Sequence, residues 1–373
     1  MIENQLLLKI YEAASMVRWN DQIRAIDISE LDKQAHKMVV AYVLGKCEQD
    51  AGNKDINWIK IIEAGLFEFL QRIVLTDIKP PLFHAIKEDS EKYRKLNKWV
   101  YSKISPVVSY LGEDFLVRFK NYLTGGIEDI NRKIIGAAHF YVTKWEFNII
   151  KRSNPEGYMV DEISESIFRQ QARYSDLLGM KQLLESKNLT DFINICGQLR
   201  FQIRWSHLYR VPKTSVLGHM LIVAIFSYLF SYIAGVDSAR CINNYFTGLF
   251  HDLPEVLTRD IINPVKKSIE GLDELIKDYE RQEMEKRIYK LIPDKWHTEI
   301  RMFTENEFSN TGVRDGELVK AADDLAAYIE AYLSLKNGIK NKDLLSAKIK
   351  IKEKYRRKNI LGIDFGKIYL NFD

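Results

Sequence analysis

The segment GLFHDLPEVLTRDIINP, residues 248–264, ends an apolar helical run with an adjacent histidine and aspartate. Neighbouring residues of a helix point about 100° apart, so His251 and Asp252 can both reach one ion beside the helix. An imidazole and a carboxylate suit divalent ions such as Mn²⁺, Co²⁺, Fe²⁺, Ni²⁺ or Mg²⁺ better than a structural zinc ion. Two ligands are too few for a metal site, so further ligands are expected elsewhere in the chain.

Two other segments carry polar side chains on helices that are otherwise apolar. His219 lies in a run without charged residues, and Asp323 and Asp324 lie in LVKAADDLAAYIEAYL, residues 318–333. A polar side chain inside a helical bundle is costly unless it is paired or ligated. Each residue alone is compatible with an ordinary core or surface position, and periodicity turns one of the two aspartates outward. Together with the His-Asp pair, they favour a metal site built from three helices.

A third acidic residue follows the His-Asp pair closely. Glu255 lies four residues after His251 and three after Asp252, which are positions on one face if the helix continues. A carboxylate beside a metal-bound water can accept or donate a proton. Pro254 is typical of a helix start, so the alternative is a new turn at this point. Asp260 follows shortly afterwards and adds a second carboxylate to the segment.

The composition favours a helical protein with two domains. The chain has 373 residues, 46% of them hydrophobic, with only 19 Gly and 8 Pro. The net charge of +4 gives no global argument for a nucleic-acid partner. Three cysteines, none in a CxxC motif, indicate reduced thiols and a cytoplasmic protein. The first residues lack the basic start and apolar core of a signal peptide.

Three segments need an interpretation before the fold is assigned. Residues 214–236 contain no Asp, Glu, Lys or Arg and are long enough to span a membrane. We favour a helix buried on all sides of a bundle, and therefore expect no membrane. Residues 336–358 are rich in Lys and Arg, which we interpret as a solvated helix face, so nucleic-acid binding is unlikely. The segment KIYLNF, residues 367–372, is compatible with a short strand or an irregular tail.

The chain contains an apparent internal repeat. RWNDQIR (18–24) matches RWSHLYR (204–210), and residues 36–81 align without a gap with residues 219–264. The matches fall on RW-x4-R, His and Gly-Leu-Phe in the same order, which makes chance an unsatisfactory explanation. We therefore predict an all-α chain of two tandem helical bundles related by duplication. The expected boundaries are 1–165 for the first domain, 166–188 for a linker and 189–373 for the second domain.

The second half resembles a known family of enzymes. The order His, His-Asp, Asp together with HDLPEVLTRDIINPVK (251–266) is similar to the HD superfamily of metal-dependent phosphohydrolases. Within it, RWSHLYRVPKTSVLGH (204–219) and the segment 318–333 resemble the bacterial 5′-deoxynucleotidases, which remove phosphate from deoxynucleoside 5′-monophosphates. The resemblance covers about residues 200–360 and implies a cytoplasmic enzyme with one divalent metal ion and a nucleotide substrate.

The resemblance also assigns roles to individual residues. It selects Asp323 over Asp324 as a ligand and places an arginine where its planar fork suits a phosphate. The implied catalytic carboxylates are Glu255 and Asp260, the implied substrate-binding residues are Arg204 and Trp205, and the implied metal ligands are His219, His251, Asp252 and Asp323. Gly218 departs from the family, which usually has Glu before the first ligand histidine. Substrate specificity is therefore open, and the alternatives are a nucleotide-sensing protein with weak catalysis, a triphosphohydrolase or a phosphodiesterase.

The repeat indicates that the first half is a degenerate copy. The alignment places His36 at the position of His219, Glu68 and Phe69 at the His-Asp pair, and Arg72 at Glu255; Asp77 matches Asp260. A weaker local match places His139 at the position of Asp323. The expected interpretation is a domain kept for packing or regulation, which pairs with the second half as an internal pseudo-dimer. The alternative is a zinc ion held by His36, Glu68 and His139, since three such ligands and a water form a known pattern.

Overall fold

The computed structural model of the chain is helical and divides into two compact units. It describes residues 4–76, 78–125, 128–261, 265 and 268–372. The first unit comprises Met1–Leu177 and Ile363–Asp373, and the second comprises Leu178–Gly362. The strands of the described residues are only two residues long. The predicted all-α class is therefore confirmed, whereas the relation of the two units by duplication stays a prediction.

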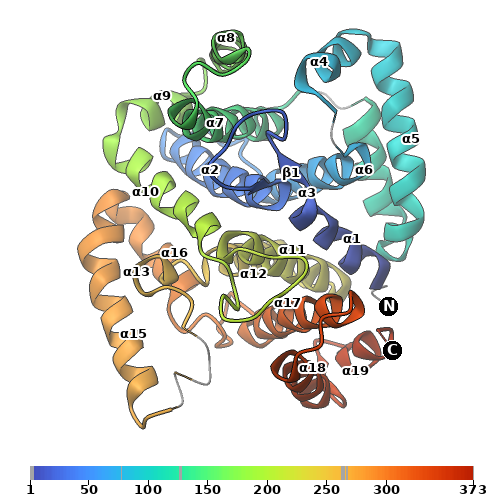
Figure 1. Cartoon of the computed structure of the whole chain (residues 1–373), viewed down its shortest axis with the longest axis vertical. Coiled ribbons are helices and arrows are strands. Elements are labelled where there is room, and N and C mark those ends of the chain that lie inside the picture. Colours follow the sequence, from blue (N-terminus) through green and yellow to red (C-terminus); the bar gives the residue numbers. More distant parts are fainter. Residues whose placement is uncertain (1–3, 77, 126–127, 262–264, 266–267, 373) are drawn as a thin grey trace. The chain divides into compact units, whose positions relative to one another are not determined.

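The first unit is built around α2, which is buried along most of its length (Figure 1). Ser29 caps this helix by accepting a hydrogen bond from the backbone N–H of Asp32, and α7, α3 and α1 pack around it. A short antiparallel pair precedes α2, with Val17 opposite Ser29. In chain order the elements of this unit are α1 (Asn4–Ser15), β1 (Val17–Arg18), β2 (Ile28–Ser29), α2 (Glu30–Asp50), α3 (Trp58–Leu75), α4 (Pro80–Glu88), α5 (Ser90–Val108), η1 (Ser109–Leu111), α6 (Glu113–Thr124), α7 (Ile130–Ser153), α8 (Val160–Ala172), β4 (Ile363–Asp364) and α19 (Phe365–Leu370).

The second unit has α11 at its centre, packed against α12 and α17 (Figure 1). Ser215 caps α11 by accepting from the N–H of Gly218, and Gly235 ends it with a φ of 66°. The elements of this unit are α9 (Leu178–Glu185), α10 (Lys187–Gln198), η2 (Leu199–Phe201), α11 (Val216–Ala234), α12 (Ser238–Phe250), α13 (Glu255–Thr258), α15 (Leu272–Glu283), the π-helical turn η3 (Met284–Ile288), η4 (Tyr289–Leu291), α16 (Asp294–Thr304), α17 (Gly316–Lys336), α18 (Lys342–Tyr355) and β3 (Asn359–Ile360).

The apolar segment singled out in the sequence is this central helix α11. Among the helices of the described residues, it alone is long and apolar enough to cross a membrane. However, 89% of its most apolar window is buried inside the folded chain. Helices that are apolar all round occur in the cores of large bundles as well as in membranes. The burial agrees with the expectation of a core helix.

A single glycine sets the distance between α11 and α12. A Cβ atom added to Gly248 would lie 2.7 Å from the backbone N and Cα of Ala224. Only a residue without a side chain therefore lets the two helices approach this closely. Gly248 lies one turn before His251, and His219 lies in the first turn and a half of α11. The close approach brings the two histidine-bearing segments together.

The last eleven residues belong to the first unit, although the sequence placed them with the second domain. The division between Leu177 and Leu178 falls inside the stretch 166–188 that the sequence suggested as a linker. The segment KIYLNF does not form a strand, because residues up to Leu370 belong to α19. Phe365, Ile368 and Tyr369 are buried, so this short helix is held by apolar packing.

Candidate metal centre

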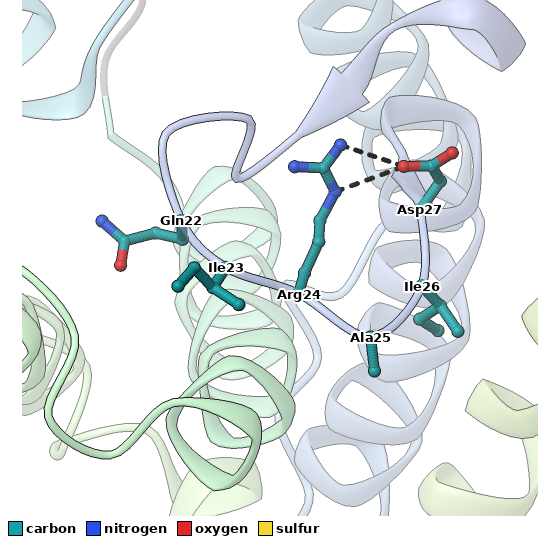
Figure 2. A pocket seen from close by; sticks show the side chains of 6 residues that line it. All are labelled: Gln22, Ile23, Arg24, Ala25, Ile26 and Asp27. Carbon is teal, nitrogen blue, oxygen red and sulfur yellow. Dashed lines mark hydrogen bonds and ion pairs between the residues drawn. The ribbon is translucent and has the colours of Figure 1, made fainter.

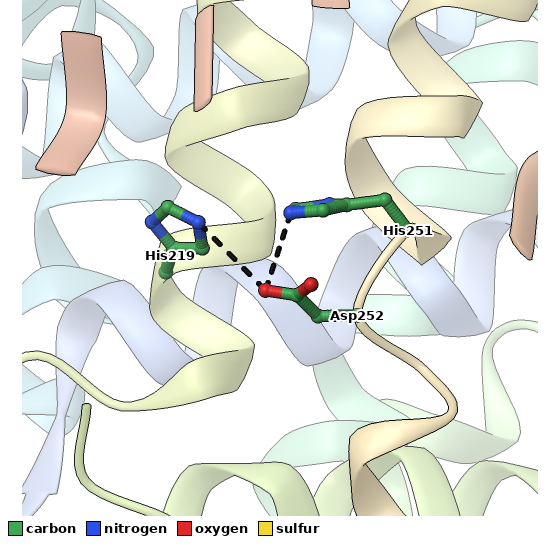
Figure 3. A group of neighbouring side chains, drawn as sticks. All are labelled: His219, His251 and Asp252. Atoms are coloured by element: carbon green, nitrogen blue, oxygen red, sulfur yellow. Dashed lines mark ion pairs between the residues drawn. The ribbon is translucent and has the colours of Figure 1, made fainter. Parts of the chain in front are cut away.

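Three side chains converge at the junction of α11 and α12. His219 lies near the start of α11, and His251 and Asp252 follow the last residue of α12. One ligand atom from each of the three lies within 4.8 Å of the other two. Figure 3 shows both imidazole rings turned toward the carboxylate of Asp252. Within the described part of the chain, no other three histidine, cysteine or acidic side chains meet this criterion.

The distances connect this group to α17. His219 Nε2 lies 3.8 Å from Asp252 Oδ2 and 3.0 Å from Asp323 Oδ1. His251 Nε2 lies 3.2 Å from the same Asp252 oxygen. Asp323 is thus connected to the group through His219, but it does not itself meet the 4.8 Å criterion with all three of the other side chains. His219 and His251 are fully or nearly fully buried, whereas Asp252 and Asp323 keep some access to solvent.

The hydrogen bonding of His251 leaves one ring nitrogen facing the group. Its Nδ1 lies 2.9 Å from the carbonyl oxygen of Gly248, an interaction that needs a proton on Nδ1. The buried Nε2 makes no hydrogen bond within the described structure, although it faces Asp252. A backbone carbonyl behind an imidazole commonly orients metal-binding histidines and fixes their tautomer. The donor set of two imidazoles and two carboxylates therefore fits a divalent ion.

The electrostatics of this group show how strongly its charges interact. Burial lowers the pKa of His251, but the adjacent Asp252 carboxylate outweighs burial and raises that pKa to about 9. Burial raises the pKa of Asp252, but the imidazoles and Arg204 hold it below its usual range. Burial and the charge of Arg204 lower the pKa of His219. Without an ion, a protonated His251 offsets the two carboxylates together with Arg204 and Lys320, and a metal ion would replace the proton on His251.

The structure separates the two neighbouring aspartates of α17. Asp323 contacts His219 and also accepts a hydrogen bond from Lys320 Nζ at 2.7 Å. Asp324 contacts Lys320, Lys354 and the hydroxyl of Tyr355, away from the histidines. Asp323 is therefore the aspartate of the pair that faces His219, and its role as a metal ligand stays a prediction.

Arg204 and Trp205 lie beside the group and are held by a residue that the sequence reasoning missed. Arg204 Nη1 lies 3.5 Å from Asp252 Oδ2, and its Nε lies 3.4 Å from Glu330 Oε2. The indole N–H of Trp205 donates to the same Glu330 oxygen at 2.8 Å. Glu330 is buried and also accepts from Thr214, and the nearby arginines lower its pKa to about 2.

Glu330 was predictable by the argument that identified Asp323. It lies seven residues after Asp323, which is close to two helical turns and therefore the same face of α17. A buried carboxylate on an apolar helix requires partners in either case. Lys320, described above, and Glu307 are two further residues near the metal centre that the sequence did not indicate. Burial and the charge of Asp252 raise the pKa of Glu307, so this carboxyl lies in the field of the centre.

The two predicted catalytic carboxylates lie on the segment that follows the His-Asp pair. The helix does not continue through this segment: α12 ends at Phe250, and Glu255 is the first residue of the new helix α13. The spacing argument for Glu255 therefore fails because Pro254 precedes a new turn, yet Glu255 is buried close after the pair. Asp260 lies two residues beyond α13, and its charge is one of those that raise the pKa of Arg204.

The first unit does not assemble the zinc ligands considered as an alternative. Among the described residues, His36, Glu68 and His139 do not form a group compatible with a metal ion. His36 stacks edge-on against Trp145, and Glu68 pairs with Lys37 at 3.0 Å. His139 contacts the ammonium group of Lys33. The zinc alternative is therefore wrong. Asp77 lies outside the described residues.

Comparison with known proteins agrees with this geometry. Residues 196–362 match the family model of the HD domain. This match lies within the second unit, which therefore contains an HD domain. HD domains bind divalent metal ions, as the donor set described above requires.

Curated relatives match part of the chain at low identity. A 5′-deoxynucleotidase of Vibrio vulnificus is 27% identical over 140 residues, which are 36% of this chain and 70% of the relative. A 5′-deoxynucleotidase of Pasteurella multocida is 23% identical over 175 residues, or 44% of this chain and 83% of the relative. The 4′-phosphooxetanocin A phosphatase of Priestia megaterium is 24% identical over 164 residues, or 42% and 79%.

Proposed function

We propose that the second unit is a metal-dependent phosphohydrolase that removes phosphate from nucleoside 5′-monophosphates, with deoxynucleotides as the preferred class. The observation that carries this proposal is the convergence of His219, His251 and Asp252, with Arg204 contacting the same aspartate. Relatives named 5′-deoxynucleotidases match 36% and 44% of the chain. The relative named 4′-phosphooxetanocin A phosphatase supports phosphate removal as the reaction.

The proposed metal ligands are His219, His251, Asp252 and Asp323. When bound, a divalent ion at these residues supplies Lewis-acid activation of the phosphoryl group and of a water molecule. Oxygen and imidazole donors favour Mn²⁺, Co²⁺, Fe²⁺, Ni²⁺ or Mg²⁺ over ions that prefer thiolates. The carbonyl of Gly248 orients His251, so this ring presents Nε2 to the centre without rearrangement.

Arg204 is the proposed phosphate-binding residue. Its guanidinium contacts Asp252 and Glu330, and burial lowers its pKa less than these carboxylates raise it, so it remains charged. A fixed guanidinium can offset the negative charge on a phosphoryl group by two parallel hydrogen bonds. Trp205 is proposed to lie on the sugar side, where Glu330 holds its indole N–H.

Glu255 and Asp260 are the proposed proton-transfer and orienting carboxylates. Glu255 is buried immediately after the metal-binding pair, where a carboxylate can take a proton from the attacking water. Asp260 acts electrostatically on Arg204 and is placed to orient water or a sugar hydroxyl. Neither role requires Glu255 or Asp260 to bind the metal ion.

The test is a metal-supplemented screen with the full-length protein. With Mn²⁺ or Co²⁺ added, it should hydrolyse deoxynucleoside 5′-monophosphates, and Asp252→Ala should abolish the activity. The matched control is Asp324→Asn, which changes a neighbouring acidic residue that faces Lys354. Full activity of Asp252→Ala, or of wild-type protein after complete chelation, would contradict the proposal. Nucleoside triphosphates and cyclic nucleotides in the same screen test the other HD-type reactions.

A cytoplasmic location and an internal pseudo-dimer of the two halves stay predictions. The pairing rests on the repeated RW-x4-R, His and Gly-Leu-Phe matches. If the two halves replace the two subunits of a dimer, residues 189–373 expressed alone should homodimerise or be insoluble. A monomeric and fully active fragment in analytical ultracentrifugation would show that the pairing is unnecessary.

A further inference from the structure

The first unit repeats the arginine-tryptophan-glutamate arrangement of the metal centre without its metal ligands. Arg18 Nε lies 2.9 Å from Glu146 Oε2, and the indole N–H of Trp19 donates to the same oxygen at 3.0 Å. Trp19 has a φ of 55° and Trp205 a φ of 53°, a backbone conformation that few residues adopt. The same constellation is thus built twice, once beside the metal centre and once in the first unit.

At the place of the ligand pair His219 and Asp323, the first unit has a lysine and a histidine. Lys33 lies four residues after the capping Ser29, just as His219 lies four residues after the capping Ser215. His139 precedes Glu146 by seven residues, the same spacing that separates Asp323 from Glu330. Lys33 Nζ lies 3.1 Å from His139 Nε2, which parallels the contact of 3.0 Å in the second unit.

This correspondence corrects the placement of His36. Counted from the N-terminal cap, the position equivalent to His219 is Lys33, since each lies four residues after its capping serine. The gap-free alignment instead followed the helix ends and was shifted by three residues at the start. His36 is therefore nearly one turn too far along α2 and packs against Trp145.

The ammonium group of Lys33 is buried without a carboxylate partner. Lys33 is only 2% exposed, and its contacts within the described residues are to the two ring nitrogens of His139. Glu30 and Glu146 are nearby but already pair with Arg18. Burial and the charge of Arg18 lower the pKa of Lys33 well below its usual range, because a buried cation without a counter-ion is costly. This cost would be relieved by an anionic ligand.

The charges around Lys33 repel a metal ion and attract an anion. Apart from Lys33, four cationic side chains stand against three carboxylates, which makes an excess of one positive charge; the cations are Arg18, Lys37, Arg72 and Lys87, and the carboxylates are Glu30, Glu68 and Glu146. Burial and the surrounding cations, Lys33 first among them, hold the pKa of His139 well below its usual range. This imidazole is therefore neutral and adds no counter-charge.

The rim of the cluster is accessible and carries aromatic rings. The side chains of Glu68 and Arg72 are 28% and 23% exposed, so the cluster reaches the surface on the α3 side. Phe140, next to His139, stacks on Tyr174 and His84 with centroid distances of 6.0 and 6.5 Å. All three rings are partly exposed. Aromatic faces of this kind accept a nucleobase by stacking, in a manner tolerant of base identity.

Arg24, in the loop between β1 and β2, does not belong to the cluster around Lys33. Arg24, the counterpart of Arg210 in the RW-x4-R match, turns to Asp27 Oδ1 and to the carbonyl of Trp19 (Figure 2). Its neighbours Gln22–Asp27 line a shallow surface pocket of their own. In the second unit, Arg210 is buried and lies 3.9 Å from Glu330. Glu146 of the first unit therefore has no counterpart of Arg210 beside it. The amino group of Lys33 lies nearby instead.

We propose that the first unit binds a nucleoside 5′-monophosphate without a metal ion. The phosphate lies against Lys33 and Arg72, and the base lies against the aromatic rings of Phe140, Tyr174 and His84. Lys33 stands at the position of the ligand His219, where a bound phosphate would stabilise its protonated form. The site has no ligand set for hydrolysis, since Phe69 and Arg72 align with Asp252 and Glu255. It is therefore a binding site and not a second catalytic centre. This proposal does not depend on hydrolysis by the second unit.

Calorimetric titration of the full-length Asp252→Ala protein in excess chelator tests the site apart from the metal centre. The probes are deoxyadenosine 5′-monophosphate, inorganic phosphate and deoxyadenosine. One saturable site for the nucleotide is expected, with weaker binding of the other two probes. Adding Lys33→Met should weaken nucleotide binding by about tenfold or more, because a charge-assisted contact is lost. Lys98→Met, an exposed lysine of α5, is the matched control and should change nothing.

The outcomes separate the parts of the proposal. No saturable nucleotide binding, or the same affinity with Lys33→Met, would overturn it. Inorganic phosphate binding as tightly as the nucleotide would refute the role of the rings, and deoxyadenosine binding as tightly would refute the role of Lys33. If Lys33→Met fails to fold by circular dichroism, Lys87→Ala replaces it. Lys87 is an exposed member of the cluster, so its loss should weaken nucleotide binding several-fold, and an unchanged affinity would also overturn the proposal.

Discussion

Trp205 donates its indole N–H to Glu330 at 2.8 Å and holds a positive φ of 53°. A tryptophan in the left-handed region is strained, and such conformations persist only where the surroundings impose them. The buried carboxylate of Glu330 is the anchor, since it also contacts Arg204 at 3.4 Å. Glu330 is thus a positioning residue for the two side chains expected to face the substrate.

Trp205→Phe should lower kcat/KM for a nucleoside monophosphate by about tenfold, because the lost hydrogen bond to a charged group loosens the substrate side of the centre. Bound metal should stay unchanged, since no proposed ligand is altered. The matched control is Trp19→Phe, which removes the same bond in the first unit. Equal losses of activity in the two variants would show that the bond serves folding in both units.

The two aspartates of α17 should differ sharply in metal binding. Asp323→Asn should weaken Mn²⁺ affinity by at least about tenfold, because the carboxylate beside His219 is neutralised. Asp324→Asn should leave the affinity unchanged, because Asp324 contacts Lys354 and Tyr355 instead. Isothermal titration with Mn²⁺ measures both. A similar effect of the two variants would refute the assignment of Asp323.

Metal binding should release a proton from His251. The pKa of its imidazole is about 9 in the metal-free protein, so the ring is protonated at neutral pH and must lose that proton before Nε2 can bind an ion. Affinity for Mn²⁺ should therefore rise by up to about tenfold per pH unit below pH 9 and level off above it. Calorimetry in buffers of different ionisation enthalpy counts the released protons. A pH-independent affinity between pH 6 and 8 would contradict the charge balance described above.

Gly248→Ala should damage the centre by separating two helices. The new Cβ would lie 2.7 Å from backbone atoms of Ala224, which cannot move aside as a flexible side chain would. We expect a loss of roughly 1–3 kcal/mol or more in stability together with weaker metal binding. Gly312→Ala is the control, because nothing lies within 4 Å of its added Cβ. Thermal unfolding with and without Mn²⁺ compares them, and wild-type behaviour of Gly248→Ala would show that the helices can separate without loss.

The sequence predicted the helical class and several of the residues that converge at the metal centre. These residues could be recognised because a polar side chain on an apolar helix must be paired or must bind a ligand. His219, His251 and Asp252 stand out for this reason, and the choice between Asp323 and Asp324 needed the family resemblance. Glu330 obeys the same rule but was overlooked because it has no place in the metal-binding motif. Its role depends on Trp205 and Thr214, which are distant in sequence.

Other features depend on geometry that a linear pattern does not contain. The place of Glu255 follows from the break at Pro254, and a continuous helix was equally compatible with the spacing. The gap-free alignment placed His36 at the position of His219, whereas counting from the capping residues Ser29 and Ser215 places Lys33 there. Lys33 carries no motif, and only its burial against His139 reveals its equivalence to a metal ligand.

The return of Ile363–Asp373 to the first unit has a consequence for how the protein is made. Domains of a chain usually fold in the order in which they leave the ribosome. Here the first unit begins first but receives α19 only after the whole second unit has been synthesised. The HD domain can therefore fold completely before α19 is available to the first unit.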